Sequence, residues 1–289
     1  MSPETLEGAI SVDVEEYFHV ENLREAAPPH TWDELPSRVE HATHRVLDLF
    51  DEAGVRGTFF TLGWVAERHP ALVREIVARG HELASHGHGH RMLTELDPDR
   101  LREDLGRARA ALEDAGGVAV RGYRAPTWSI VPATDWAFDV LVEAGYRYDA
   151  SVFPVRHDRY GDPRAPIVPH WRVREGGRLL ELPPLVGRFA GRNWPAAGGG
   201  YLRLLPLGYM RWAVRQARAA ARPAVLYLHP WELDPDQPRL AVSRLRRLRH
   251  YRGLERFADR LRTVLGWLRL GRMDSLADAW QDRARPWPA

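Results

Sequence analysis

The sequence of 289 residues contains neither cysteine nor lysine, so all 41 of its basic residues are arginines. Without cysteine, the chain has no disulfide bond, no thiolate nucleophile and no cysteine-ligated zinc or iron–sulfur site. Without lysine, it lacks Schiff-base chemistry and the phosphate-binding loops that need a lysine side chain. Any metal site must therefore be built from histidine, aspartate and glutamate.

Long apolar runs and a strong excess of one charge are also missing. No stretch approaches the roughly 18 consecutive apolar residues of a spanning helix, and MSPETLEGAISVDVEE at the N-terminus has no basic segment followed by an apolar run. The formal net charge of +2 does not favour nucleic acid as a partner. We expect a soluble cytoplasmic protein, acting at the inner membrane face if its substrate lies there.

Strand-like and helix-like segments alternate along the first half of the chain. GAISVDV (8–14), RGTFFTLG (56–63), ELASH (82–86) and AVRGYRAP (119–126) predict strands, and apolar residues recur at helical spacing between them. This order is typical of a mostly parallel sheet with helices outside, as a barrel or a doubly wound sheet. Active sites of such folds gather at the carboxyl ends of the strands.

The second half of the chain is less regular. Residues 150–200 are rich in proline, glycine and aromatics, which is typical of functional loops. A helix at 207–222, the strand AVLYLHP (224–230) and a helix near 252–268 then resume the pattern. We predict one domain over residues 1–268, including loops at 150–206 that offer a surface for a homo-oligomer, and a loosely ordered tail at 269–289. The arginine-rich run 239–252 is interpreted as a solvated helix face, and binding of an anionic polymer or phosphate is the alternative.

Polar side chains cluster where the predicted strands end, and they are Asp13, Glu15, Glu16, His86, His88, His90, Arg124 and His229. Two histidines four residues apart with a small link can face one metal ion. A carboxylate from another strand end completes a two-histidine, one-carboxylate set that leaves coordination positions open. The alternative is a glycine-rich turn whose histidines only bond locally or face solvent.

Five motifs, SVDVEEYF, SHGHGH, RAP, YDAS and LYLH, follow one another in an order that carries a family resemblance. Over about residues 8–230 the chain resembles the polysaccharide deacetylases of carbohydrate esterase family 4, also called the NodB-homology family. VDVEEYFHV and RHYRGLERF further resemble its exosortase-associated branch, which is tied to exopolysaccharide production. The resemblance implies a distorted (β/α) barrel with mostly parallel strands, and a divalent metal, expected to be zinc. It also implies removal of N-acetyl groups from an amino-sugar polymer or its lipid-linked precursor.

The resemblance assigns catalytic roles to four residues. Asp13 corresponds to the catalytic base, and Arg124 to the arginine that keeps this base ionised and oriented. His229 corresponds to the catalytic acid, and Asp149 to the acidic residue that orients the acid histidine.

The metal ligands implied by the resemblance are Glu15, His86 and His90. The common family pattern has two adjacent aspartates, whereas here one residue separates the acidic pair and its second member is a glutamate. Glu16 is therefore an alternative ligand. His88 occupies a variable position and is expected to support the site or to face the substrate.

Substrate contacts are expected from a backbone amide and from aromatic rings. The N–H of Thr127, where the family often has tyrosine, is placed to meet an oxyanion. Pyranose rings stack on aromatic faces, and Trp128, Trp171, Trp194 and Trp231 lie near the motif loops. Among them we predict Trp128 and above all Trp231 as substrate-binding residues.

Hydrolysis of an acetamide needs a polarised carbonyl, an activated water and a protonated leaving amine, and this residue set provides for each task. The leading prediction is therefore a metal-dependent N-deacetylase. One alternative is a hydrolase of a small cyclic amide, as in the allantoinase-like members of the fold, several of which lack the metal. Another is an inactive carbohydrate-binding relative. The intact set of Asp13, His86, His90 and His229 favours the deacetylase.

Overall fold

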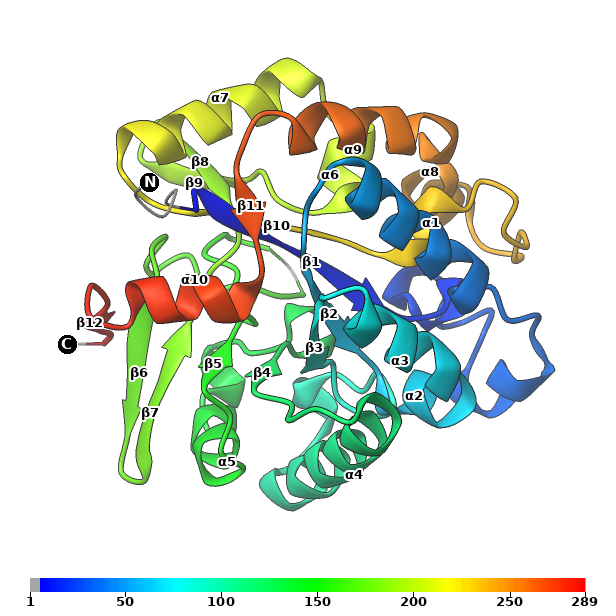
Figure 1. The fold of residues 1–289 in the computed structure, drawn as a ribbon, viewed down its shortest axis with the longest axis horizontal. Helices are drawn as coiled ribbons and strands as arrows, with labels where there is room; N and C mark the ends of the chain where they lie inside the picture. The colour runs from blue at the N-terminus through cyan, green and yellow to red at the C-terminus, as the bar shows by residue number, and fades with distance from the viewer. Residues whose placement is uncertain (1–5, 158, 289) are drawn as a thin grey trace.

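A computed structural model describes residues 6–157 and 159–288 of the chain. Its centre is a sheet with the strand order β10-β1-β2-β3-β4-β5-β7-β6-β12, with β11 beside β1 (Figure 1). All of its pairings are parallel except that of β6 with β7. These strands are β1 (Gly8–Val14), β2 (Thr58–Thr61), β3 (Glu82–Ser85), β4 (Gly122–Tyr123), β5 (Tyr148–Asp149), β6 (His170–Arg174), β7 (Gly177–Glu181), β10 (Ala224–Leu228), β11 (Leu270–Gly271) and β12 (Arg285–Pro286). A separate antiparallel hairpin consists of β8 (Val186–Phe189) and β9 (Arg192–Pro195).

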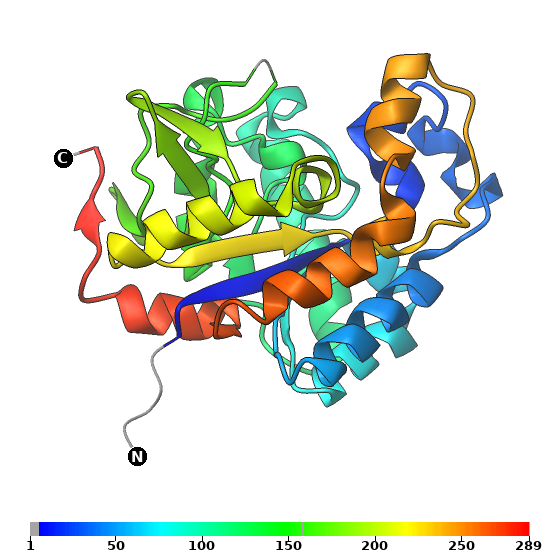
Figure 2. The same ribbon diagram turned by 90° about the horizontal axis from the view of Figure 1, so that it is seen from above.

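Helices cover the outside of the sheet (Figures 1 and 2). They are α1 (Val39–Glu52), α2 (Gly63–Arg68), α3 (Pro70–Ala78), α4 (Pro98–Gly116), α5 (Ala137–Glu143), α6 (Gly199–Leu204), α7 (Leu207–Ala219), α8 (Arg244–Tyr251), α9 (Phe257–Leu265) and α10 (Met273–Trp280). Asp97 caps α4 as its sequence suggests, because its carboxylate accepts a hydrogen bond from Arg100 N at 2.9 Å. The predicted α/β class with a mostly parallel sheet is confirmed.

The segment after β7 brings the two sides of the sheet together. Leu182 N donates to Asp149 O in β5 and Leu185 N donates to Val225 O in β10, each at 2.9 Å. Through this segment the strands close into the distorted barrel that the sequence predicted.

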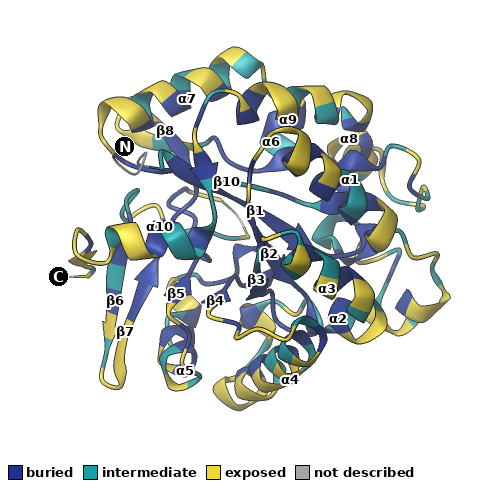
Figure 3. Ribbon diagram, viewed as in Figure 1, coloured by how far each residue is buried: buried dark blue, intermediate teal, exposed yellow. Residues whose placement is uncertain are grey.

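Strand β1 shows how this architecture places polar groups. All seven of its residues are buried, as expected for a parallel strand covered on both faces. Ile10, Val12 and Val14 pack with the outer helices, whereas Ala9 belongs to a cluster inside the barrel. Because successive side chains alternate between the faces, Asp13 points to the inner face at the carboxyl end of the strand. Figure 3 shows the same division, with buried strands at the centre and exposed residues on the outer sides of the helices.

The expectation of a loosely ordered tail at 269–289 is wrong for the residues that the structure describes there. Strand β11 pairs with β1, β12 pairs with β6, and α10 buries Met273 and Leu276. Trp171 Nε1 also donates to Gln281 O at 3.1 Å. The sequence concealed this order because each element is short and gains its stability from the strands beside it rather than from a long periodic pattern.

Candidate active site

A cavity of 490 Å³ opens at the carboxyl ends of β1, β3 and β10. Its lining contains the ionisable residues Asp13, Glu15, Glu21, His86, His90, His157, Arg159, Arg203, His229, Glu232, Arg249 and His250. The cavity brings together five of the eight strand-end residues singled out in the sequence, namely Asp13, Glu15, His86, His90 and His229.

Glu15, His86 and His90 form a cluster whose ligand atoms all lie within 4.8 Å of one another. Glu15 Oε2 is 2.7 Å from His90 Nε2 and 4.0 Å from His86 Nε2. His86 Nδ1 donates to Arg124 O at 2.8 Å, so its Nε2 lone pair faces the carboxylate. Burial lowers the pKa of His86 to about 4, which keeps this imidazole neutral. Two histidine nitrogens and one carboxylate are the donors that a catalytic zinc ion prefers, so the residues fit a divalent metal.

The carboxyl group of Glu15 is held in its charged form. Burial raises its pKa, but the neighbouring His90, His229 and His86 lower it by more, so the pKa lies far below its usual value. Trp231 Nε1 donates to Glu15 Oε1 at 3.2 Å and fixes the second oxygen. The carboxylate therefore has a defined orientation with Oε2 turned towards the two histidines.

The loop SHGHGH is shaped by a residue that the sequence analysis missed. Asp104 of α4 accepts hydrogen bonds from His88 N at 2.8 Å and from Gly89 N at 3.4 Å. Gly87 has a φ of 74° and His90 one of 49°, so the chain turns sharply on both sides of these bonds. Asp104 lies in the next helix along the chain, so no short sequence motif links it to this loop. The only signal in the sequence is that the backbone N–H groups of the loop need an acceptor.

Two residues next to the cluster face elsewhere. Glu16, the alternative ligand, accepts hydrogen bonds from the backbone N–H groups of Arg38 and Val39 at the start of α1. His88 is buried with its Nε2 3.1 Å from Glu67, and it does not line the cavity. The expectation that His88 faces the substrate is wrong, because the glycines on either side turn it towards α2 and α4.

Asp13 and Arg124 form the buried pair that the sequence predicted. Arg124 Nη1 donates to Asp13 Oδ1 at 2.5 Å, and Arg124 Nε donates to Ala150 O at 3.1 Å. The guanidinium lies over the rings of Phe60 and Trp128, at 4.1 and 4.7 Å from their centroids. These contacts leave Asp13 Oδ2 directed into the cavity, where it is 3.8 Å from His229 Nε2.

His229 is held by Glu232 and Arg203. Its Nδ1 lies 3.3 Å from Glu232 Oε2, and Arg203 Nε donates to Glu232 Oε1 at 2.9 Å. Burial lowers the pKa of His229, but the bond to Glu232 and the charges of Glu232, Glu15 and Asp13 raise it to about 9. His229 is therefore protonated at neutral pH in this arrangement.

The partner of His229 corrects the role expected for Asp149. Asp149 is fully buried and accepts hydrogen bonds from Ser151 Oγ at 2.6 Å and Ser151 N at 3.0 Å. Burial raises the pKa of Asp149, and burial together with the charge of Asp149 raises the pKa of Glu181 beside it. Asp149 thus supports the strand that presents Ala150 O to Arg124, whereas Glu232 orients the histidine.

Room for Glu232 comes from the glycine run at 198–200. A Cβ atom on Gly199 would lie 1.7 Å from Glu232 Oε2, so any larger residue there would displace the carboxylate. This explains a glycine-rich stretch that the sequence analysis left as an irregular loop. The carboxylate three residues after His229, in HPWE, was the available signal for this contact.

The predicted substrate aromatics lie in the cavity wall, but their faces are occupied. Trp231 stacks between His229 and His250, with ring centroids 5.2 and 4.3 Å away. Trp128 packs against Arg124 and Tyr227 and is 5% exposed. Neither indole offers a free face for a pyranose ring, so the stacking role predicted for Trp231 is wrong. Its N–H instead holds the Glu15 carboxylate.

Other aromatic candidates have different positions. Trp171 and Trp194 lie outside the cavity, on β6 and β9. Tyr160 and Tyr201 line it, and their hydroxyl groups are 3.0 Å apart. Thr127 also lines the cavity, in a strained backbone conformation with a φ of 55°. Its role at an oxyanion stays a prediction.

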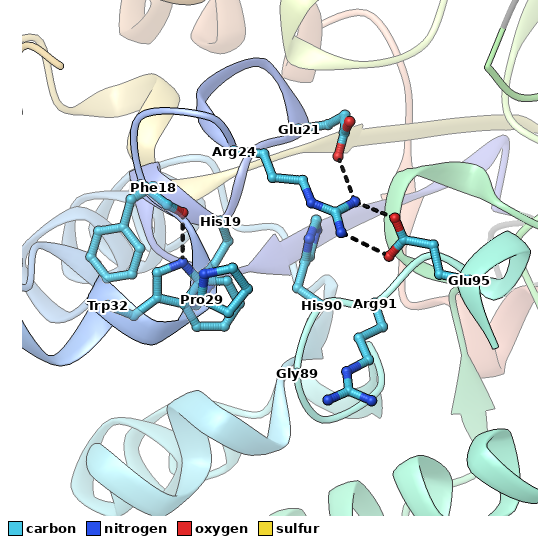
Figure 4. Close-up of a pocket in the computed structure, with 11 residues that line it drawn as sticks. Phe18, His19, Glu21, Arg24, Pro29, Trp32, Gly89, His90, Arg91 and Glu95 are labelled. Carbon is cyan, nitrogen blue, oxygen red and sulfur yellow. Dashed lines mark hydrogen bonds and ion pairs between the residues drawn. The ribbon is translucent and has the colours of Figure 1, made fainter. Parts of the chain in front are cut away.

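His90 also borders a second cavity of 340 Å³ (Figure 4). Arg24 bridges Glu95 and Glu21 at its edge, with an ion pair to Glu21 of 3.7 Å. His19, which the sequence analysis did not single out, stacks on His90 with ring centroids 6.0 Å apart. Burial lowers the pKa of His19 well below its usual value. A neutral ring therefore supports the back of one histidine of the cluster.

Comparison with known proteins relates parts of the chain to two family models. Residues 29–148 match the family model named polysaccharide deacetylase, and residues 150–278 match a domain of unknown function, DUF3473. The first of these segments is thus similar to polysaccharide deacetylases.

One curated relative of this chain is the chitooligosaccharide deacetylase of Rhizobium leguminosarum bv. trifolii, which is 32% identical over 137 residues. The match spans 39% of this chain and 62% of the relative, which is less than two thirds of the relative's length.

Two solved structures share the fold. A provisionally assigned polysaccharide deacetylase from Mycobacterium smegmatis aligns with a TM-score of 0.64 and 24% identity, over 99% of this chain and 94% of that chain. The allantoinase PuuE aligns with a TM-score of 0.60 and 16% identity, over 97% and 92% of the two chains. The fold is thus common to a deacetylase-like protein and an allantoinase, and the substrate must be argued from the site.

Proposed function

We propose that this protein is a metal-dependent hydrolase that removes N-acetyl groups from amino sugars of an exopolysaccharide or its precursor. One observation carries the proposal. The Glu15, His86 and His90 cluster, Asp13 fixed by Arg124, and His229 fixed by Glu232 all face a single cavity.

The cluster is proposed to hold a divalent metal, and its two-histidine, one-carboxylate donors suit zinc. When bound, such an ion polarises a carbonyl and lowers the pKa of water from 15.7 to about 7. Burial keeps His86 a neutral ligand and its bond to Arg124 O orients the ring, while the neighbours of Glu15 keep that carboxylate charged. Trp231 holds Glu15 through a hydrogen bond, and His19 stacks on the ring of His90.

Asp13 and His229 are proposed to move the protons. Asp13 Oδ2 accepts the proton of the water that attacks the acetamide carbonyl, because its other oxygen is tied to Arg124. His229 Nε2 then donates a proton to the departing nitrogen as the C–N bond breaks and acetate is released. The two atoms are 3.8 Å apart, so acid and base serve the same point of the cavity. The backbone N–H of Thr127 is proposed to donate to the oxyanion.

Similarity to a curated relative and the lining of the cavity support the proposed substrate class. The relative from Rhizobium leguminosarum bv. trifolii is named for chitooligosaccharides, which are N-acetylated. Tyr160 and Tyr201 supply aromatic rings and hydroxyl groups to the cavity here, as a sugar requires. Membership of the exosortase-associated branch stays a prediction from VDVEEYFHV and RHYRGLERF.

The decisive experiment compares two histidines of one motif. Metal content and acetate release from N-acetylglucosamine oligomers are measured for the wild type, His86→Ala and His88→Gln. We expect about one metal ion per chain and acetate release in the wild type, loss of both in His86→Ala, and retention of both in His88→Gln. Absence of metal from the wild type after zinc is supplied would contradict the mechanism. Metal without acetate release from any N-acetylated oligomer would favour the cyclic-amide hydrolase.

A further inference from the structure

The segment 239–253 has an extreme charge for this chain. It carries Arg239, Arg244, Arg246, Arg247, Arg249 and Arg252 and no acidic residue. Because the whole chain has a net charge of only +2, the remainder has more acidic residues than arginines. Helix α8 lies in this segment and stands at one end of the molecule beside the first helical turns of the chain (Figure 2). Positive charge is therefore concentrated on one projecting helix.

The outer face of α8 is also apolar. Leu245 is 57% exposed and Leu248 is 50% exposed, and their spacing of three residues places them on one side of the helix. His250 and Tyr251 at the end of the helix are buried and fix it to the body. An exposed leucine pair on a helix that is already anchored contributes nothing to the core.

The arginines around the leucines are largely unpaired. Arg246 forms an ion pair with Glu25, so its charge is already neutralised within the protein. Among the described residues, no acidic group pairs with Arg244, Arg247 or Arg249, and all three are exposed. Leucines flanked by free arginines on one helix are typical of segments that lie in the interface of an anionic membrane.

The position of α8 connects this surface with the active site. Arg249 and His250 line the active-site cavity, and so does Leu204, which is 44% exposed. A surface that contacts α8 therefore lies next to the opening through which substrate enters. An anionic polysaccharide explains the arginines but not the leucines, whereas a lipid bilayer explains both.

We propose that α8 docks the protein on an anionic lipid bilayer. Leu245 and Leu248 enter the headgroup region, and Arg244, Arg247 and Arg249 contact lipid phosphates. The interpretation of 239–252 as a solvated face is thereby replaced for α8. None of the described helices is long and apolar enough to cross a membrane. The inference concerns attachment and does not depend on the reaction at the cavity.

Vesicle co-sedimentation tests this docking directly. The full chain is mixed with vesicles of phosphatidylcholine alone or with 30% phosphatidylglycerol, in low and high salt. We expect binding to the anionic vesicles that weakens with salt, and little binding to neutral ones. Arg244→Gln with Arg247→Gln should lower the partition coefficient about 30-fold, because each arginine near an anionic surface contributes about a factor of five. Leu245→Ser with Leu248→Ser should lower it about tenfold or more.

The hairpin β8–β9 offers matched controls away from α8. Phe189 and Trp194 are exposed by 67% and 47%, and Arg188 and Arg192 flank them. Phe189→Ser with Trp194→Ser, and Arg188→Gln with Arg192→Gln, should leave vesicle binding unchanged. Circular dichroism and acetate release from a soluble oligomer verify that each variant is folded.

Three results would overturn the proposal. These are no wild-type binding to anionic vesicles, equal binding by the α8 variants, or equal loss in the hairpin variants. Binding to soluble anionic polysaccharide that needs the arginines but not the leucines would assign α8 to a polymer instead.

Discussion

The two halves of the chain contribute opposite sides of one cavity, and they do so in different ways. The first half supplies Asp13 and Glu15 from the end of β1 and His86 and His90 from the end of β3, the two strands that flank β2 in the sheet. The second half supplies His229, whose orientation depends on Glu232 and on Arg203, which lies 29 residues before Glu232 in the chain. The metal side, which we define as Asp13, Glu15, His86 and His90, is thus made by regular β/α units. The acid side, which we define as Arg203, His229 and Glu232, comes from a less regular region of the chain.

The two sides of the cavity also differ in which family model their residues match. On the metal side, His86 and His90 lie in residues 29–148, which match the polysaccharide deacetylase model, whereas Asp13 and Glu15 lie before them at the end of β1. The acid side, the cavity tyrosines and α8 all lie in residues 150–278, which match the domain of unknown function. The first half thus carries the proposed metal ligands and base, and the second half carries the proposed acid, the cavity tyrosines and α8.

The largest expected effect tests the metal side. Glu15→Gln removes the charged ligand, so we expect metal occupancy to fall and acetate release to drop on the order of 10³-fold. Glu16→Gln is the matched control, because Glu16 accepts hydrogen bonds from Arg38 N and Val39 N instead. It should keep the metal and lose about 1 kcal/mol of stability. Metal analysis, an acetate assay and urea unfolding are measured for both variants. An equal loss of metal in Glu15→Gln and Glu16→Gln would contradict the assignment of Glu15 as the ligand.

The acid side gives the next effect. Glu232→Gln should lower kcat about 100-fold at unchanged metal content, because the histidine loses the charge that keeps it protonated. Asp149→Asn should keep kcat within about threefold, since Asp149 bonds Ser151 and not His229. Steady-state kinetics on both variants show whether Glu232 or Asp149 orients His229. A larger kcat loss in Asp149→Asn would restore the role that the sequence first suggested for it.

The sequence predicted the metal side because its signals are local. Histidines four apart and acidic residues that end an apolar strand are visible as short motifs, and parallel strands bring such ends together without further information. The barrel class followed from the same alternation of strands and helices. Strand β4 is only two residues long within the strand predicted over 119–126, and the two-residue strand β5 was not predicted, because such short strands are defined by their neighbours in the sheet.

The acid side and the aromatic contacts were less predictable because they depend on packing. The position of Asp149 in its motif did not show that Ser151 and Glu181 would occupy its carboxylate. The sequence also did not show that Trp231 has a histidine on each face. Residues that act through a second side chain are fixed by the folded structure, and their spacing carries little information.

A smaller effect sharpens the metal side. Asp104 holds the loop of His86 and His90 through two backbone amides but touches neither ring. Asp104→Ala should weaken metal affinity about tenfold, as loss of a supporting contact does, and Asp104→Asn should recover part of it. Competition with a chromophoric chelator measures the affinity. If both variants lose only stability and bind metal like the wild type, Asp104 does not position the ligands.

The smallest effect on activity is expected at the other end of the barrel, where Glu82 joins the two halves. Its carboxyl group accepts hydrogen bonds from Tyr148 Oη at 2.7 Å and Asp274 N at 3.0 Å. Burial and the charge of Asp274 raise its pKa from 4.5 to about 7. The folded state therefore binds a proton that the unfolded state releases between these values, so stability falls as pH rises through this window, by about 3 kcal/mol.

Glu82→Gln tests this linkage without touching the active site. Glutamine is neutral at every pH, and its amide can accept from Asp274 N and donate to Tyr148 Oη. We expect the variant to keep its kcat and to show a flatter stability profile from pH 5 to pH 8, measured by urea unfolding. The exposed Glu103→Gln control should follow the wild type. A wild-type profile in Glu82→Gln would mean that another buried acid, such as the Asp149 and Glu181 pair, dominates the pH dependence.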